Sequence, residues 1–178
     1  MTARSRAAVL ATAALGGTLL LSGCGTSNVA AVAGDRVITQ DDVAQARAQY
    51  NAQNFKDPQS GAPEQLSERS ALWLLIIAPT VIDAAAASGA TQSADATRTQ
   101  FTVGDDISDA AVLARQGRDS LLVMNQASGT KAVAALKALK VSVNPQYGTF
   151  SLQKGISPIS PAWVLPTAAS TTTTVPQQ

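Results

Sequence analysis

The most reactive residue in this sequence is Cys24, the only cysteine in a chain of 178 residues. It ends the segment Leu21-Ser22-Gly23-Cys24, in which an apolar residue and two small residues precede a thiol. Arg4 and Arg6 give the chain a positive start, and an apolar run extends from Ala7 to Leu21. A positive start followed by an apolar run and small residues is the pattern of a signal peptide. The run is too short for a membrane span, which needs about 20 apolar residues.

This segment resembles the lipobox of bacterial lipoproteins. The resemblance implies that the Cys24 thiol accepts a diacylglycerol, that the chain is cut just before it, and that the new amino group can take a further acyl chain such as palmitate. The alternative is that Cys24 is an ordinary small residue in a secretory cleavage region. Two or three acyl chains give stable anchoring, whereas one is marginal. We therefore expect an exported protein held by lipid at the outer face of the cell membrane.

Few residues of this sequence could support other catalytic chemistry, because the chain contains no histidine. Histidine is the most frequent general base and the commonest metal ligand. With Cys24 committed to lipid, a disulfide, a Cys–His pair, a Ser–His–Asp triad and an ordinary zinc site are all excluded. Carboxylate pairs, Ser–Lys dyads and oxygen-ligand metal sites remain open. We interpret Asp41-Asp42 as helix capping and Asp105-Asp106 as a turn, and expect no enzyme activity, cofactor or metal.

The composition favours a helical domain. Alanine is abundant and aromatic residues make up 4% of the chain, which favours helices over a β-rich core. The 13 basic residues nearly balance the 12 acidic ones, and no basic stripe suggests a nucleic acid partner. We expect a signal peptide over residues 1–23, a tether over 24–28, one domain over 29–155 and a disordered Ser/Thr/Pro-rich tail over 156–178.

The first elements of the domain have clear boundary signals. Two short apolar runs flank Gly34-Asp35, which predicts a β-hairpin over 29–38, or one strand and a turn into a helix. Thr39 is the expected N-cap of a helix that reaches about Gln53 and buries one face, formed by Val43, Ala46 and Tyr50. A polar loop follows at residues 56–65.

The most hydrophobic stretch of the domain, Ala71 to Ile82, follows a capping residue, Ser67. It predicts a helix that is buried nearly all round or presents one face to a partner, that Pro79 breaks or kinks, and that stops near Gly89. We name Leu72, Trp73 and Ile76 as candidate peptide-binding residues. The alternative is that they belong to the core.

The remaining helices are predicted from caps and periodicity. Ser93 should cap a short helix to about Thr102, Ser108 a longer one ending at Gly129, and Thr130 a third. On the helix after Ser108 we expect a solvated face, and on the helix after Thr130 we expect an apolar side directed inward. The solvated residues would be Arg115, Arg118 and Asp119, and the inward residues Val133, Ala134, Leu136, Ala138 and Leu139.

Apolar and polar residues alternate in Val141-Ser142-Val143-Asn144 and again from Tyr147 to Leu152, which predicts strands. Our hypothesis is that the segment 29–37 pairs with the segment 141–150 and closes the helical domain. Within the tail, Trp163, Val164 and Leu165 either fold back onto the domain, which we prefer, or form a docking motif.

Two stretches resemble a known family. The segment 32–39, Val-Ala-Gly-Asp-Arg-Val-Ile-Thr followed by an acidic first turn, resembles the opening of the SurA/PrsA-type foldases. The segment 141–150, Val-Ser-Val-Asn-Pro-Gln-Tyr-Gly-Thr-Phe, resembles the closing segment of the lipoprotein branch of that family in high-GC Gram-positive bacteria. The resemblance covers roughly residues 29–152.

The resemblance implies a mainly α fold with a small β element: a helical SurA N-terminal (trigger-factor-like) peptide-binding domain closed by short strands from both chain ends. It implies binding of unfolded or nascent exported proteins. The parvulin domain of many members, and the histidines of its site, have no counterpart here, so isomerase activity is not implied. We therefore expect a membrane-anchored chaperone-like binder without catalysis. The alternative is a structural or accessory lipoprotein that docks one cell-envelope partner.

Overall fold

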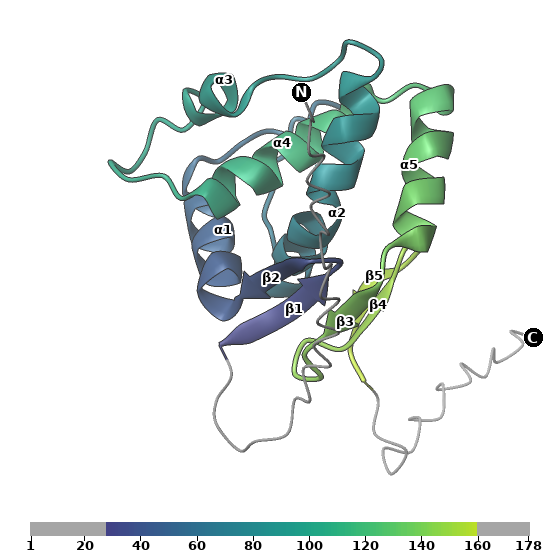
Figure 1. Ribbon diagram of the computed structural model, residues 1–178. Coiled ribbons are helices and arrows are strands. Elements are labelled where there is room, and N and C mark those ends of the chain that lie inside the picture. Colours follow the sequence, from purple (N-terminus) through teal and green to yellow (C-terminus); the bar gives the residue numbers. More distant parts are fainter. Residues whose placement is uncertain (1–27, 160–178) are drawn as a thin grey trace, which may run out of the picture.

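The structure, a computed structural model, describes residues 28–159 and places helix α2 (Glu68–Ala86) at their centre (Figure 1). The other helices are α1 (Gln40–Ala52), α3 (Ala94–Arg98), α4 (Asp109–Val123) and α5 (Gln126–Ala138). Helices α1, α4 and α5 pack around α2, and α3 lies against α4. About half of the described residues are helical and the strands are short, which confirms the prediction of a mainly α protein with a small β element.

A three-stranded antiparallel sheet joins the two ends of the domain. Its strands are β1 (Val29–Ala33), β2 (Arg36–Thr39) and β3 (Val141–Val143), in the order β2-β1-β3. Val32 pairs with Val37 on one side and with Ser142 on the other. This register confirms the predicted hairpin and the hypothesis that the first strand pairs with the segment after the last helix.

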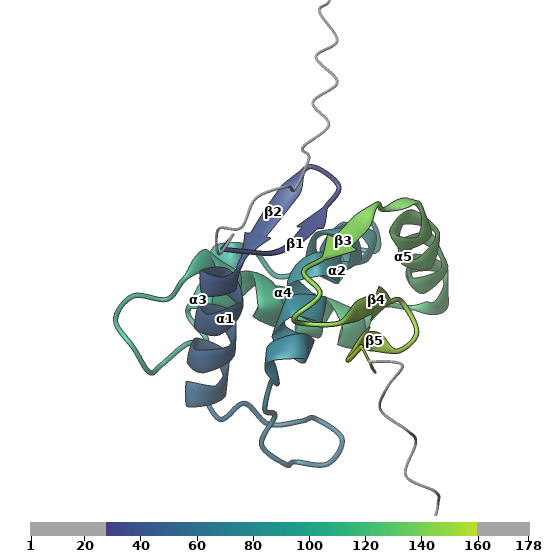
Figure 2. The same ribbon diagram turned by 90° about the horizontal axis from the view of Figure 1, so that it is seen from below.

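A second hairpin follows the sheet. Strands β4 (Thr149–Ser151) and β5 (Gly155–Ser157) pair with each other, and β5 packs against α2 (Figure 2). Ile156 is buried, so the domain continues past residue 155 and the predicted boundary between domain and tail is wrong. Asn28 also belongs to the domain rather than the tether, because its carbonyl accepts a hydrogen bond from Gln40 and its side chain donates to Asp41.

Four predicted N-caps are confirmed: Thr39, Ser67, Ser93 and Ser108 each accept a hydrogen bond from a backbone N–H in the first turn of their helix. Asp42 completes a capping box with Thr39, by accepting from the Thr39 backbone N–H at 2.8 Å. The neighbouring carboxylates of Asp41 and Asp42 therefore serve the start of a helix, as expected.

Helix α2 forms the core on most of its circumference. Ten of its residues are buried, and they come from every side of the helix: Ala71, Leu72, Leu74, Leu75, Ile76, Ile77, Ala78, Val81, Ala84 and Ala85. By length and apolar character α2 would also qualify as a membrane span, but its position in the core accounts for the same composition. The helix continues through Pro79 and ends at Ala86, with Gly89 at a φ of 72° just beyond.

Two contacts fix α2 in place. Pro79 has no N–H to donate to the carbonyl of Leu75, four residues earlier, and Arg36 Nη1 of β2 donates to that carbonyl at 3.3 Å. On another side, Gly117 of α4 lies so close to Ala78 that a Cβ at position 117 would be 2.6 Å from the Ala78 Cβ. The glycine, which weakens a helix in isolation, therefore permits α2 and α4 to pack closely.

The boundary between the last two helices differs from the prediction. Helix α4 ends at Val123, Asn125 caps α5 by accepting from Ser128 N–H, and Gly129 and Thr130 lie inside α5. The Asn125 cap precedes Thr130 and satisfies the first turn, so the later capping signal is unused. Val133, Ala134 and Ala138 are exposed rather than inward, because α5 packs on one side only, against α2. Helix α3 also ends earlier than predicted, at Arg98.

Cys24, the signal peptide over 1–23 and the apolar segment Trp163-Val164-Leu165 lie outside the described residues.

Candidate functional site

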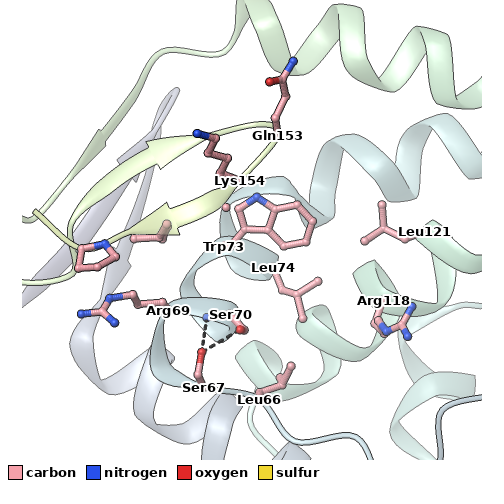
Figure 3. A pocket seen from close by; sticks show the side chains of 13 residues that line it. Leu66, Ser67, Arg69, Ser70, Trp73, Leu74, Arg118, Leu121, Gln153 and Lys154 are labelled. Carbon is pink, nitrogen blue, oxygen red and sulfur yellow. Dashed lines mark hydrogen bonds between the residues drawn. The ribbon is translucent and has the colours of Figure 1, made fainter. Parts of the chain in front are cut away.

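An open groove lies between the first half of α2, the β4–β5 hairpin and α4 (Figure 3). Its volume of about 630 Å³ is in the range of ligand pockets. Its apolar lining comes from all three elements and from the loop before α2: Leu66, Trp73, Leu74, Leu121, Ile156 and Pro158. Its polar lining is Ser67, Arg69, Ser70, Arg118, Gln153 and Lys154.

Trp73 lies in the middle of this groove. Figure 3 shows its indole ring between Leu74 of α2 and Lys154 of the hairpin, with Leu121 on the α4 side. Gly155 packs next to the ring: a Cβ at that position would make an ordinary contact, 3.8 Å from Trp73 Cδ1, and it is the φ of 73° that favours glycine there. Trp73 Nε1 is buried and has no hydrogen-bond partner among the described residues. A buried donor without an acceptor is uncommon, and here it adjoins an open groove.

Of the three residues named from the sequence, only Trp73 reaches the groove. Leu72 is fully buried and Ile76 is 1% exposed, so the prediction that they bind peptide is wrong. Residues 72 and 76 are one helical turn apart and share the inward face, whereas residue 73 is rotated by about 100° from residue 72. The rotation places Trp73 at the edge of the core.

The rim of the groove is basic. Three cations line it, Arg69, Arg118 and Lys154, and no Asp or Glu does. The Arg69 Nε donates to the backbone carbonyl of Tyr147 at 2.9 Å, which links α2 to the segment before β4. Within residues 28–159, neither Arg69 nor Lys154 forms an ion pair. Two of the three positive charges are therefore uncompensated.

Arg118 differs because it belongs to a partly buried network around Glu64. Its Nε donates to Glu64 Oε1 at 2.9 Å, and its Nη2 contacts both Glu64 and Asp57. The Tyr50 hydroxyl donates to the second oxygen of Glu64. The guanidinium of Arg115 lies 3.0 Å from Asp119 and 4.2 Å from the centre of the Phe55 ring.

This network corrects the prediction of a solvated face on α4. The side chains of Arg115, Arg118 and Asp119 are only 17%, 24% and 22% exposed. Their partners Glu64 and Asp57 come from the loop between α1 and α2, which the network fastens onto α4. Leu66 of this loop lines the groove, so the ion pairs that hold the loop on α4 also hold this part of the groove wall in place.

Burial sets the electrostatics of this network. It raises the pKa of the Asp119 carboxyl, with the nearby charge of Glu64 adding to the effect and Arg115 opposing it. It also raises the pKa of Tyr50, whose hydroxyl donates to Glu64. Hydrogen bonds from Ser60 lower the pKa of Asp57. The tyrosine therefore stays protonated as a donor, and it acts in the packing of the loop.

The groups that line the groove are suited to binding. Among residues 28–159, no group of three or more His, Cys, Asp or Glu side chains is placed to hold a metal ion. The hydroxyls at the groove, Ser67 and Ser70, are 2.8 Å from each other, and Ser67 also caps α2. An aromatic side chain, apolar walls and uncompensated cations are the groups of a recognition surface.

Comparisons with protein-family models, curated proteins and solved structures found no match. The groove must therefore be interpreted from its own residues.

Proposed function

We propose that this chain is an exported, lipid-anchored protein that binds segments of unfolded or partly folded exported polypeptides, without catalysis, in the groove around Trp73. The observation that carries the proposal is the partly exposed indole of Trp73, which lies in a groove with apolar walls and a volume of about 630 Å³. Aromatic and aliphatic side chains of an extended chain are bound by surfaces of this kind, because burial of their apolar area drives association.

The resemblance to SurA/PrsA-type foldases supports the same function. In that family a helical domain is closed by strands from both chain ends, and here β1 pairs with β3. We propose that the finer fold is the SurA N-terminal, trigger-factor-like domain. The anchor would be the acylated Cys24, only four residues before Asn28, at the start of the described domain. This spacing would hold the domain close to the membrane, where exported chains emerge.

A binding assay tests the proposal. Residues 24–178 with Cys24→Ser keep every described residue and remove the lipid, and are mixed with a denatured model protein and with apolar peptides. We expect suppression of aggregation at near-stoichiometric ratios and a loss of both activities in Trp73→Ser. The control is Val133→Ser on the exposed face of α5, which should retain both. Thermal unfolding of each variant separates loss of binding from loss of fold.

A second candidate is an accessory lipoprotein that docks one envelope partner. It is favoured by the small size of the groove and by the burial of most of α2, which leaves little apolar surface for varied clients. A photo-crosslinking residue placed at Lys154 in living cells distinguishes the two. Many weak products would support the chaperone-like function, and one dominant product the dedicated partner.

A further inference from the structure

We infer that the groove around Trp73 selects polypeptide segments in which an apolar or aromatic side chain lies next to acidic residues. The inference rests on the proposed function and specifies the ligand of the same site. It is carried by the charges at the rim, which are all positive, in a chain whose acidic and basic residues are nearly equal in number.

The cations are placed to act on a bound ligand. Lys154 is exposed in the turn of the β4–β5 hairpin, where its backbone N–H donates to Ser151 Oγ. Arg69 is exposed on α2, and its Nε is held by the carbonyl of Tyr147. This hydrogen bond limits the positions of the guanidinium and leaves its terminal nitrogens available to a carboxylate.

The two cations lie at different places on the rim of the groove (Figure 3). Lys154 adjoins the Trp73 ring from the hairpin, whereas Arg69 lies one helical turn before Trp73 on α2 and its side chain extends away from the indole. A side chain packed on the indole would therefore have Lys154 close to it, and residues farther along the bound segment would approach Arg69. An extended segment places successive residues about 3.3 Å apart, which allows carboxylates near the apolar residue to reach them.

Arg118 adds no comparable attraction, because Glu64 and Asp57 already compensate its charge. A basic ligand segment gains nothing from the rim and is repelled by Arg69 and Lys154. An exposed ion pair changes affinity by a few-fold at most. An acidic segment gains two attractions where a basic segment meets two repulsions, so the acidic segment should bind about ten-fold more tightly.

The test uses residues 24–178 with Cys24→Ser and Trp163→Phe, so that Trp73 is the only tryptophan and its fluorescence reports binding in the groove. Three extended peptides share one central Leu-Phe pair and carry Glu, Gln or Lys at the flanking positions. We expect the Glu peptide to bind about ten-fold more tightly than the Lys peptide, with the Gln peptide between them. The difference should shrink as salt is raised, because exposed charges are screened.

Lys154→Glu should narrow or reverse the preference, and among the described residues the Lys154 side chain forms no ion pair that the fold requires. Lys131→Glu on the exposed side of α5 changes the net charge equally and should leave the preference as it is. Equal binding of the three peptides overturns the inference and leaves the proposed function standing. Binding of none of them refutes the proposed function. Binding that appears only after residues 160–178 are deleted, without charge preference, assigns the groove to the chain's own tail and overturns the inference.

Discussion

The hydrogen bond from Arg36 to the carbonyl of Leu75 gives a quantitative prediction. Pro79 lacks the N–H that this carbonyl would accept in a regular helix, and Arg36 of β2 supplies the donor instead. Arg36 is partly buried, and this burial lowers the pKa of its guanidinium despite the nearby charge of Asp42. Arg36→Met keeps an apolar stem of similar length and removes the donor.

The expected cost follows from these contacts. Hydrogen bonds to charged groups contribute about 1.5–3 kcal/mol, and the part exposure of Arg36 reduces this to about 1–2 kcal/mol. For a domain of this size the melting temperature should fall by roughly 4–7 °C. In Pro79→Ala the restored N–H can bond the Leu75 carbonyl, so the same Arg36→Met change should cost less than about 0.5 kcal/mol there.

Urea unfolding of the four proteins in this cycle measures both values. An equal cost of Arg36→Met in the wild-type and Pro79→Ala backgrounds would refute the coupling, because the arginine would then stabilise the hairpin independently of the proline. A change in the urea m-value in any of the four would show that the unfolded state had changed as well.

Three further predictions concern the groove wall, the buried charges and the anchor. Gly148→Ala should detach β5 and weaken peptide binding, since Gly148 has a φ of 120° and a Cβ there would lie 2.0 Å from the Ser157 carbonyl oxygen. Fluorescence titration measures the loss of affinity, and unchanged affinity would contradict the role of the hairpin. Because burial raises the pKa of Asp119, its ionised form destabilises the fold as pH rises through that pKa. Relative to wild type, the free energy of unfolding of Asp119→Asn should therefore be higher at pH 7 than at pH 4, as measured by urea unfolding at both pH values. The opposite order would show that the ion pair with Arg115 dominates. Cys24→Ala should abolish incorporation of a labelled palmitate and membrane association in cells, and retention of both would count against lipidation at this residue.

Local chemistry explains which parts of the fold can be predicted from the sequence. Thr39, Ser67 and Ser108 cap helices through hydrogen bonds to residues three positions later, so the signal lies within one turn. The pairing of β1 with β3 can be inferred because both segments have the pattern of a strand and each is too short to be stable alone.

The features that the sequence does not predict depend on contacts between residues that are far apart in the chain. Arg118 looks solvated from the pattern of α4 alone, and its partner Glu64 lies 54 positions away in a loop. Leu72 and Trp73 are adjacent in a uniformly apolar run, and only the packing of neighbouring helices decides which one faces the groove. Strand β4 lies within the predicted segment 147–152, but its partner β5 escapes prediction because the residues from 156 resemble the Pro-rich tail, although Gly148 before β4 and Gly155 at the start of β5 have the positive φ of turns.

The pairing of β1 with β3 has a consequence for the order of folding and acylation in the export that we propose. The central strand of the sheet is among the first described residues, and its partner Val143 is separated from Ala31 by nearly the whole domain. A chain that crosses a membrane from its N-terminus cannot form this pair until residue 143 has emerged. Cys24 would emerge long before that point, so acylation would act on an incompletely folded chain, and the domain would close only after its N-terminal end was already fixed at the membrane surface.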